Sequence, residues 1–190
     1  MFVDYLTLML VNLVAGLVLL AVFLVFFAER DGKKLVSGFL LTGFIGIVTG
    51  LPLTLSWPLP GSHNIAFGET ALLFGGLFFF AGIALHKDWD LLGLGIYAVL
   101  GGAVAVIIGA RILNLGMTQE PVIAFLGYLF TGIGAILTLP AYLLRKNLAF
   151  RVVVALVLLA GAAVWALTGF GSYWAHLESF SKYLPPTMKG

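Results

Sequence analysis

Long apolar runs separated by short polar breaks dominate the chain. A helix that crosses a bilayer needs about 20 mostly apolar residues, and six runs reach that length. The pattern therefore predicts six transmembrane helices joined by short connections. These are expected over Tyr5–Ala28, Leu35–Leu55, Ile65–Leu85, Leu91–Ala110, Pro121–Leu144 and Leu148–Phe170.

The amino-acid composition indicates that lipid, rather than water, surrounds this bundle. Of the 190 residues, 62% are hydrophobic and only 9% are charged, whereas soluble domains carry roughly a quarter charged residues. The sequence thus predicts an all-α, polytopic protein whose first partner is the lipid bilayer. The chain has no cysteine, which excludes disulfides and thiolate metal sites. A formal net charge of +2 gives no support for a nucleic-acid partner.

Basic residues predict the orientation, because lysine and arginine concentrate in cytoplasmic loops. The first, third and fifth connections with their flanks hold seven of them, and the remaining segments hold three. We therefore expect a plasma-membrane protein with those three loops in the cytoplasm and both termini outside. The seven are Arg30, Lys33, Lys34, Lys87, Arg145, Lys146 and Arg151, and the three are Arg111, Lys182 and Lys189.

Small residues recur at four-residue spacing on several of the expected helices. Such stripes let helix backbones approach closely in lipid, so they predict a tight, Gly-rich bundle; pore lining is the alternative. The same faces could contact further copies of the chain or other membrane subunits. The stripes are Gly38, Thr42, Gly46 and Gly50; Gly101, Ala105 and Gly109; and Gly127, Thr131, Gly134 and Thr138.

The end of the chain differs from the six runs. We expect residues 1–171 to form the transmembrane domain and residues 172–190 to form an amphipathic helix on the outer surface. Tyr173, Leu177, Phe180 and Leu184 fall on one helical face of this tail, as in helices that lie in the membrane interface. This placement would bring His176 toward the outer loops.

The connection between the second and third runs, LSWPLPGSHNIAFGE, is rich in helix-breaking and turn-forming residues. Pro58 and Pro60 disfavour helix at the residues before them, so the second helix must end by Trp57. Asn64 is a good candidate N-cap for the third helix. Glu69 would then lie about 7 Å along that helix at 1.5 Å per residue. It is either an interfacial acid stabilised by the dipole at the helix N-terminus, which could also pair with Arg111, or a carboxylate that binds a ligand, proton or metal.

Other polar residues are expected on the same outer face. Arg111 ends the fourth helix and could pair with Glu69 or Glu120 or bind an anion. Glu120 precedes Pro121, which suits the first position of a helix, so Glu120 is expected to cap that helix. The ligand-site candidates are Glu69, Arg111, His63, Asn64, Glu120 and His176.

Histidines raise the question of a cofactor. His63 and His176 could face each other at one depth, as two axial haem ligands must, and His63, Glu69 and His176 could together hold a metal. Taken alone, each is more simply explained as an interfacial histidine, with His63 bonded to backbone. Asn12, inside the first run, needs a polar partner in lipid and is expected to bond between helices.

The run WPLPGSHNIAFGE also carries a resemblance. Together with the MFVDYLTLMLVNLVAG start, it resembles an uncharacterised prokaryotic family of integral-membrane proteins, domain-of-unknown-function family 981, over nearly the whole chain. The resemblance implies a small multi-helix membrane protein and brings no catalytic residue with it. It rests on Trp57, Pro58, Gly61, Asn64, Phe67, Gly68 and Glu69.

Three classes of function stay open on the sequence. The first is a non-catalytic binding or accessory subunit of a membrane complex, with an outer polar site. The second is a channel or facilitator for a small solute or ion, and the third a membrane redox protein with a metal or haem. The common hydrolase, nucleotide-binding and zinc-protease motifs are absent from the sequence, which makes an enzyme the less expected outcome.

Overall fold

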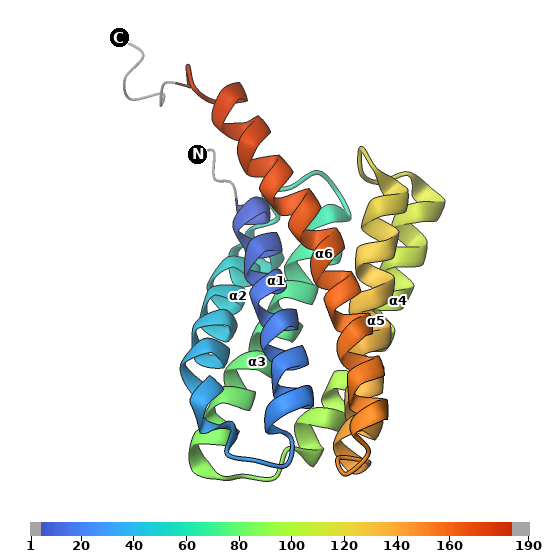
Figure 1. Ribbon diagram of the computed structural model, residues 1–190. Helices are drawn as coiled ribbons and strands as arrows, with labels where there is room; N and C mark the ends of the chain where they lie inside the picture. The colour runs from blue at the N-terminus through green and yellow to red at the C-terminus, as the bar shows by residue number, and fades with distance from the viewer. Residues whose placement is uncertain (1–4, 184–190) are drawn as a thin grey trace.

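The computed structural model describes residues 5–183, and this part of the chain forms six helices that run alternately up and down (Figure 1). Two π-helical turns extend them: η1 (Phe23–Phe27) continues α1, and η3 (Asn64–Glu69) leads into α3, while a 3-10 turn, η2 (Gly32–Leu35), opens α2. The helices are α1 (Tyr5–Val22), α2 (Val36–Ser56), α3 (Thr70–Lys87), α4 (Leu92–Leu115), α5 (Pro121–Leu143) and α6 (Leu148–Ser179).

All six helices are long and apolar enough to cross a membrane, which confirms the number predicted from the hydrophobic pattern. Two of them run beyond their apolar runs. The α4 helix continues to Leu115 and ends where Gly116 adopts a left-handed φ of 60°, a conformation that glycine takes without steric cost. The α6 helix continues to Ser179. An apolar run marks the part of a helix in lipid, whereas the helix itself stops only at a breaker.

The expected division at residue 171 has no counterpart in the backbone, because residues 172–179 are a direct continuation of α6. At 1.5 Å per residue, its 32 residues measure about 48 Å, well beyond a hydrocarbon core of about 30 Å. Its last turns project past the rest of the bundle (Figure 1) and expose Trp174 and Leu177. Residues 184–190 of the expected tail, including Leu184, lie outside the described residues.

The helices form a closed ring. Each one packs against its neighbours in the sequence, and α1 packs against α6. The tightest contacts join α2 to α3 and α4 to α5, and the seam between α3 and α4 has the fewest contacts of the six. The ring therefore has one weak seam, between α3 and α4, and we call α1–α3 its first half and α4–α6 its second half in chain order.

Glycines set the close approach within each half. A Cβ atom on Gly43 would lie 2.2 Å from the backbone nitrogen of Phe79, so α2 and α3 touch backbone to backbone. In the other half, a Cβ on Gly102 would lie 2.5 Å from the carbonyl oxygen of Gly132. These glycines act as packing surfaces between helices, as Gly46 of a predicted stripe also does against Gly75.

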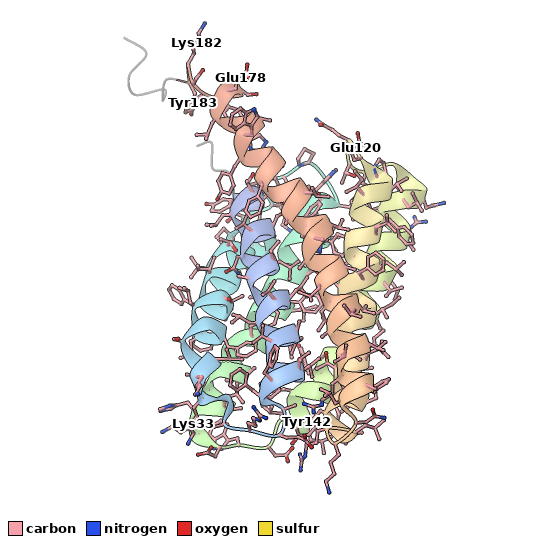
Figure 2. The ribbon with its side chains drawn as sticks, viewed as in Figure 1. Lys33, Glu120, Tyr142, Glu178, Lys182 and Tyr183 are labelled. Atoms are coloured by element: carbon pink, nitrogen blue, oxygen red, sulfur yellow. The ribbon has the colours of Figure 1, made fainter. Side chains whose placement is uncertain are left out.

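The ring has two distinct ends. The start of α1, the end of α6 and the α2–α3 and α4–α5 connections lie at the upper end in Figure 1, and the three other connections lie at the lower end. Lys33 and Tyr142 mark the lower end in Figure 2, and Glu120 and Glu178 mark the upper. Inside the ring, Asn12 donates a hydrogen bond of 2.8 Å to the carbonyl oxygen of Thr42, the interhelical bond expected of a polar group in lipid.

Candidate functional site

The α2–α3 connection at the upper end is organised by a buried amide. Trp57 ends α2 in the left-handed region, at φ 47° and ψ 54°, as the following proline requires a departure from helix. Asn64 is fully buried. Its Oδ1 accepts from the backbone nitrogen of Leu59 at 2.9 Å, and its Nδ2 donates to the carbonyl oxygens of Leu59 and of Gly61. Asn64 therefore folds the loop back on itself.

The prediction that Asn64 caps the third helix is wrong. His63 occupies the N-cap position of η3 and makes no capping hydrogen bond with its side chain. The residue type pointed correctly to local backbone bonding, since asparagine bonds both helix ends and turns. The choice between them depends on the path of the loop, which only the folded structure provides.

His63 joins the two upper connections. Its Nδ1 lies 2.8 Å from the carbonyl oxygen of Pro60, and its Nε2 lies 2.5 Å from that of Met117, in the α4–α5 connection. Both partners are acceptors, so a neutral ring donates to one of them and a protonated ring to both. The hydroxyl of Thr118, the next residue in the chain, is buried without a hydrogen-bond partner in the part of the chain that the structure describes. His63 thus fastens the two halves of the ring together at this end.

The other upper-end candidates do not assemble around it. Glu69 is exposed at the end of η3, and among the described residues its side chain forms no ion pair or hydrogen bond. Arg111 bonds instead to Oδ1 of Asn114 at 2.8 Å. Glu120 holds the N-cap position of α5, before Pro121, but its side chain makes no capping bond. The expected ion pair between Glu69 and Arg111 is therefore absent from the described structure.

His176 lies close to a different part of the chain. Nδ1 of His176 lies 3.1 Å from Oγ1 of Thr7, so it fastens the projecting end of α6 to the start of α1. Nowhere between residues 5 and 183 do three histidine, aspartate or glutamate side chains gather closely enough to hold a metal ion. The set His63, Glu69 and His176 is consequently not brought together as one ligand group.

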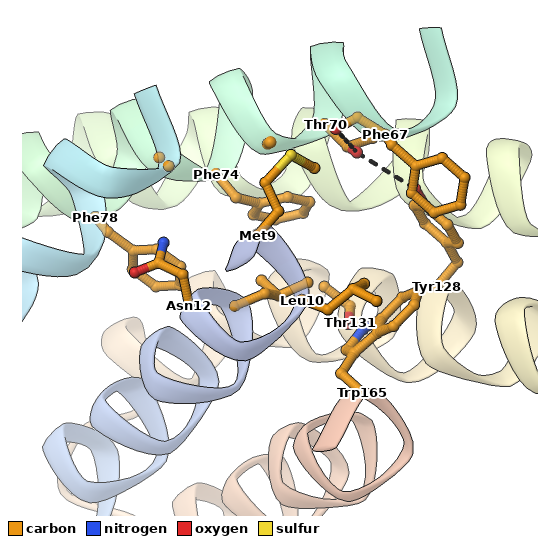
Figure 3. Close-up of a pocket in the computed structure, with 14 residues that line it drawn as sticks. Met9, Leu10, Asn12, Phe67, Thr70, Phe74, Phe78, Tyr128, Thr131 and Trp165 are labelled. Atoms are coloured by element: carbon orange, nitrogen blue, oxygen red, sulfur yellow. Dashed lines mark hydrogen bonds between the residues drawn. The ribbon is translucent and has the colours of Figure 1, made fainter. Parts of the chain in front are cut away.

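The centre of the ring holds two cavities that the sequence gave no means to locate. The smaller, of about 40 Å³, is walled by side chains such as Met9, Leu10 and Phe67 (Figure 3), and Phe67 belongs to η3 at the upper end of the ring. The larger, of about 90 Å³, is lined by residues from all six helices, among them Leu17 and Phe39. We call them the upper and the central cavity.

Three residues, Phe74, Phe78 and Thr131, line both cavities, so the two lie on either side of a shared wall. Phe39 and Phe78 stack there with ring centroids 6.1 Å apart. Leu17 and Leu158, also in the central cavity, are 2% and 0% exposed to the outside. Material in the central cavity would therefore touch side chains that surrounding lipid cannot reach.

The polar groups of both cavities are already bonded to the protein. The hydroxyl of Tyr128 donates to the carbonyl oxygen of Ala66 at 2.6 Å, and Nε1 of Trp165 donates to Oγ1 of Thr131 at 2.9 Å. Thr138 bonds to its own helix, at the carbonyl oxygen of Gly134. Apolar cavities whose polar neighbours are satisfied stay dry and accept apolar guests.

At the lower end, Arg151 is 4% exposed in the first turn of α6. Its Nη1 donates to the carbonyl oxygen of Leu24 at 2.7 Å, and its Nη2 to Oε2 of Glu29 at 3.2 Å, while its Nε is buried without a hydrogen-bond partner among residues 5–183. In the sequence Arg151 is indistinguishable from the loop cations around it. Its burial follows from the π-helical turn η1, which presents Leu24 to it, and no sequence signal marked that turn.

Fold and site together define a multi-helix bundle of the membrane-protein type, with six helices long and apolar enough to cross a bilayer and an apolar centre. Its family is equally definite. The chain belongs to the family described as protein of unknown function (DUF981), whose model matches residues 1–179. This confirms the resemblance drawn from the WPLPGSHNIAFGE run. Comparison with curated proteins and with solved structures gives no match.

Proposed function

We propose that the protein is a non-catalytic binding protein of the membrane, which holds a short part of an apolar chain between its six helices. The observation that carries this proposal is the central cavity, which touches every helix of the ring and has an almost wholly apolar lining. As an accessory subunit, the protein would present this chain beside other membrane subunits or further copies of itself.

The cavity chemistry favours an apolar occupant over an ion. An ion that leaves water loses its hydration and needs polar groups to replace it. The central cavity offers Thr131, Thr138 and Tyr142 as its hydroxyl-bearing side chains, and each of them already takes part in a hydrogen bond. The facilitator and redox hypotheses have no comparable observation in their favour.

The proposed occupant can be tested with a lipid whose acyl chain carries a photoreactive label at its end. The purified protein is placed in nanodiscs of phosphatidylcholine that carry a photoreactive diazirine at the end of one acyl chain. After illumination, adducts are mapped by mass spectrometry. We expect adducts on interior residues such as Leu17, Phe39 and Leu158. Adducts confined to lipid-facing residues such as Leu100 and Ile107, which are 62% and 63% exposed, would overturn the proposal.

A matched pair of variants on one helix sharpens this test. Ala98 lines the central cavity, whereas Ala103 lies on the same helix and is exposed. Ala98→Leu should abolish most interior adducts while the fold is kept, because the larger side chain fills the void. Ala103→Leu should leave the adducts unchanged. If Ala98→Leu does not fold, Ala81→Leu tests the same wall from α3.

A further inference from the structure

The central cavity reaches its lower limit at Tyr142, and a surface depression begins at the same side chain. The depression measures about 550 Å³ and lies between the α3–α4 and α5–α6 connections, where it is lined by Asp90, Arg145 and Lys146 among others. Tyr142 lines both spaces. Its ring therefore separates an apolar interior from a charged surface.

The depression has more positively charged than negatively charged side chains. The carboxylate of Asp90 accepts from the hydroxyl of Tyr142 at 3.0 Å and from the backbone nitrogen of Leu92 at 2.7 Å. The guanidinium of Arg145 lies 5.4 Å from the centroid of the Tyr142 ring, and Lys146 follows it in the chain. Neither cation takes part in an ion pair within residues 5–183. Two available cations beside one occupied carboxylate favour an anion.

The seam beside this junction is the loosest in the ring. The α3 and α4 helices make the fewest contacts of any neighbouring pair. The closest approach that the glycines show there is loose, since a Cβ atom added to Gly101 of α4 would lie 3.7 Å from Cδ1 of Leu77 on α3. A chain from the bilayer that enters through this seam would therefore displace less packing than at any other seam of the ring.

We propose that this junction is a binding site for an anionic phospholipid. Its phosphate is held by Arg145 and Lys146, and one acyl chain passes Tyr142 into the central cavity while the other stays in the bilayer. This inference rests on the proposed function, since it names the source of the apolar chain and the group that anchors it.

The headgroup, rather than the acyl chain, must provide the selectivity of this site. A chain that moves from lipid into a dry cavity gains no hydrophobic free energy, because both surroundings are apolar. It gains only the dispersion contacts that an empty cavity lacks. Selectivity must then come from the phosphate and the two cations, and a basic residue near an anionic lipid surface contributes about fivefold in binding.

The test compares two headgroups on the whole protein. The protein is reconstituted in nanodiscs of equal parts phosphatidylglycerol and phosphatidylcholine, extracted in mild detergent, and analysed for retained lipid by mass spectrometry. We expect phosphatidylglycerol to be enriched. The variant Arg145→Gln/Lys146→Gln should reduce that enrichment by about fivefold for each residue. Lys34→Gln/Lys87→Gln removes the same charge outside the depression and should leave it unchanged.

The outcomes separate this inference from the proposed function. If interior photoadducts form but the two lipids are retained equally, the anionic site is overturned and the apolar-chain function stands. Equal losses in both charge variants also overturn the site, because a general surface potential would then explain the enrichment. If interior adducts never form, both proposals fall.

Discussion

The hydroxyl of Tyr128, on α5, donates a hydrogen bond to the carbonyl oxygen of Ala66, inside the π-helical turn η3. Arg151, on α6, bonds in the same manner to Leu24 inside the other π-helical turn, η1. A π-helical turn takes carbonyl oxygens out of the regular helical ladder. In both cases a side chain from the second half of the ring compensates a turn in the first half.

The bond of Tyr128 can be tested by removing one atom. Tyr128→Phe keeps the ring, which is 4% exposed, and takes away the donor to Ala66. We expect a loss of about 1 kcal/mol, or a melting temperature lower by about 2–4 °C, because Thr70 still donates to the same oxygen. Thermal unfolding in detergent measures it. Tyr97→Phe, at an exposed position, should not change the melting temperature; equal shifts would contradict the assignment.

Arg151 should matter more than any exposed cation at the same end. Arg151→Ala leaves Leu24 without its donor and Glu29 without its partner, so we expect a loss of about 2–3 kcal/mol in the free energy of unfolding. Arg151→Lys should recover part of this, since one ammonium cannot reach both oxygens as a fork does. Denaturant or thermal unfolding gives the comparison.

The matched control is the exposed ion pair between Lys33 and Asp88, at 2.6 Å. Asp88→Asn breaks it and keeps a residue that tolerates the left-handed backbone found there, at φ 56°. Exposed pairs contribute little to stability, so this variant should melt close to the wild type. A result in which Arg151→Ala and Asp88→Asn behave alike would rule out a special role for the buried guanidinium.

Removal of the Asn64 side chain should let the α2–α3 connection open locally. Asn64→Ala removes three hydrogen bonds and leaves the backbone groups of Leu59 and Gly61 without their partner. We expect a loss of about 2–3 kcal/mol together with faster proteolysis of the α2–α3 connection in nanodiscs. Asn114→Ala removes an exposed bond to Arg111 and should show neither effect. Unchanged proteolysis of the Asn64 variant would show that the loop holds its shape by other means.

Glycine substitutions should separate packing from propensity. Gly43→Ala places a methyl group 2.2 Å from the backbone of Phe79, which cannot move aside, so it should cost about 1–3 kcal/mol. Gly76→Ala meets nothing within 4 Å and should be neutral or gain about 0.5–1 kcal/mol from helix propensity. Thermal melts of the two variants give opposite shifts if α2 and α3 touch as described.

The sequence by itself determined the solvent and the elements of this protein. Hydrophobic length specified six helices because lipid offers no partner for backbone groups, so every spanning segment must be helical. Pro58 specified the end of α2 at Trp57, and the isolation of Asn12 among apolar residues specified its need for a partner. These features depend on local chemistry, which can be read one residue at a time.

The tertiary structure alone decided which helices are neighbours and what space lies between them. A helix that is apolar on all sides has no polar face to indicate its inward direction, so the closed ring, its two cavities and the burial of Arg151 left no trace in the pattern. The pairing expected for Glu69 failed for a related reason. Arg111 lies on a helix that runs past its apolar stretch and has Asn114 one turn away. Only the relative placement of helices could decide between a neighbour in the chain and one in space.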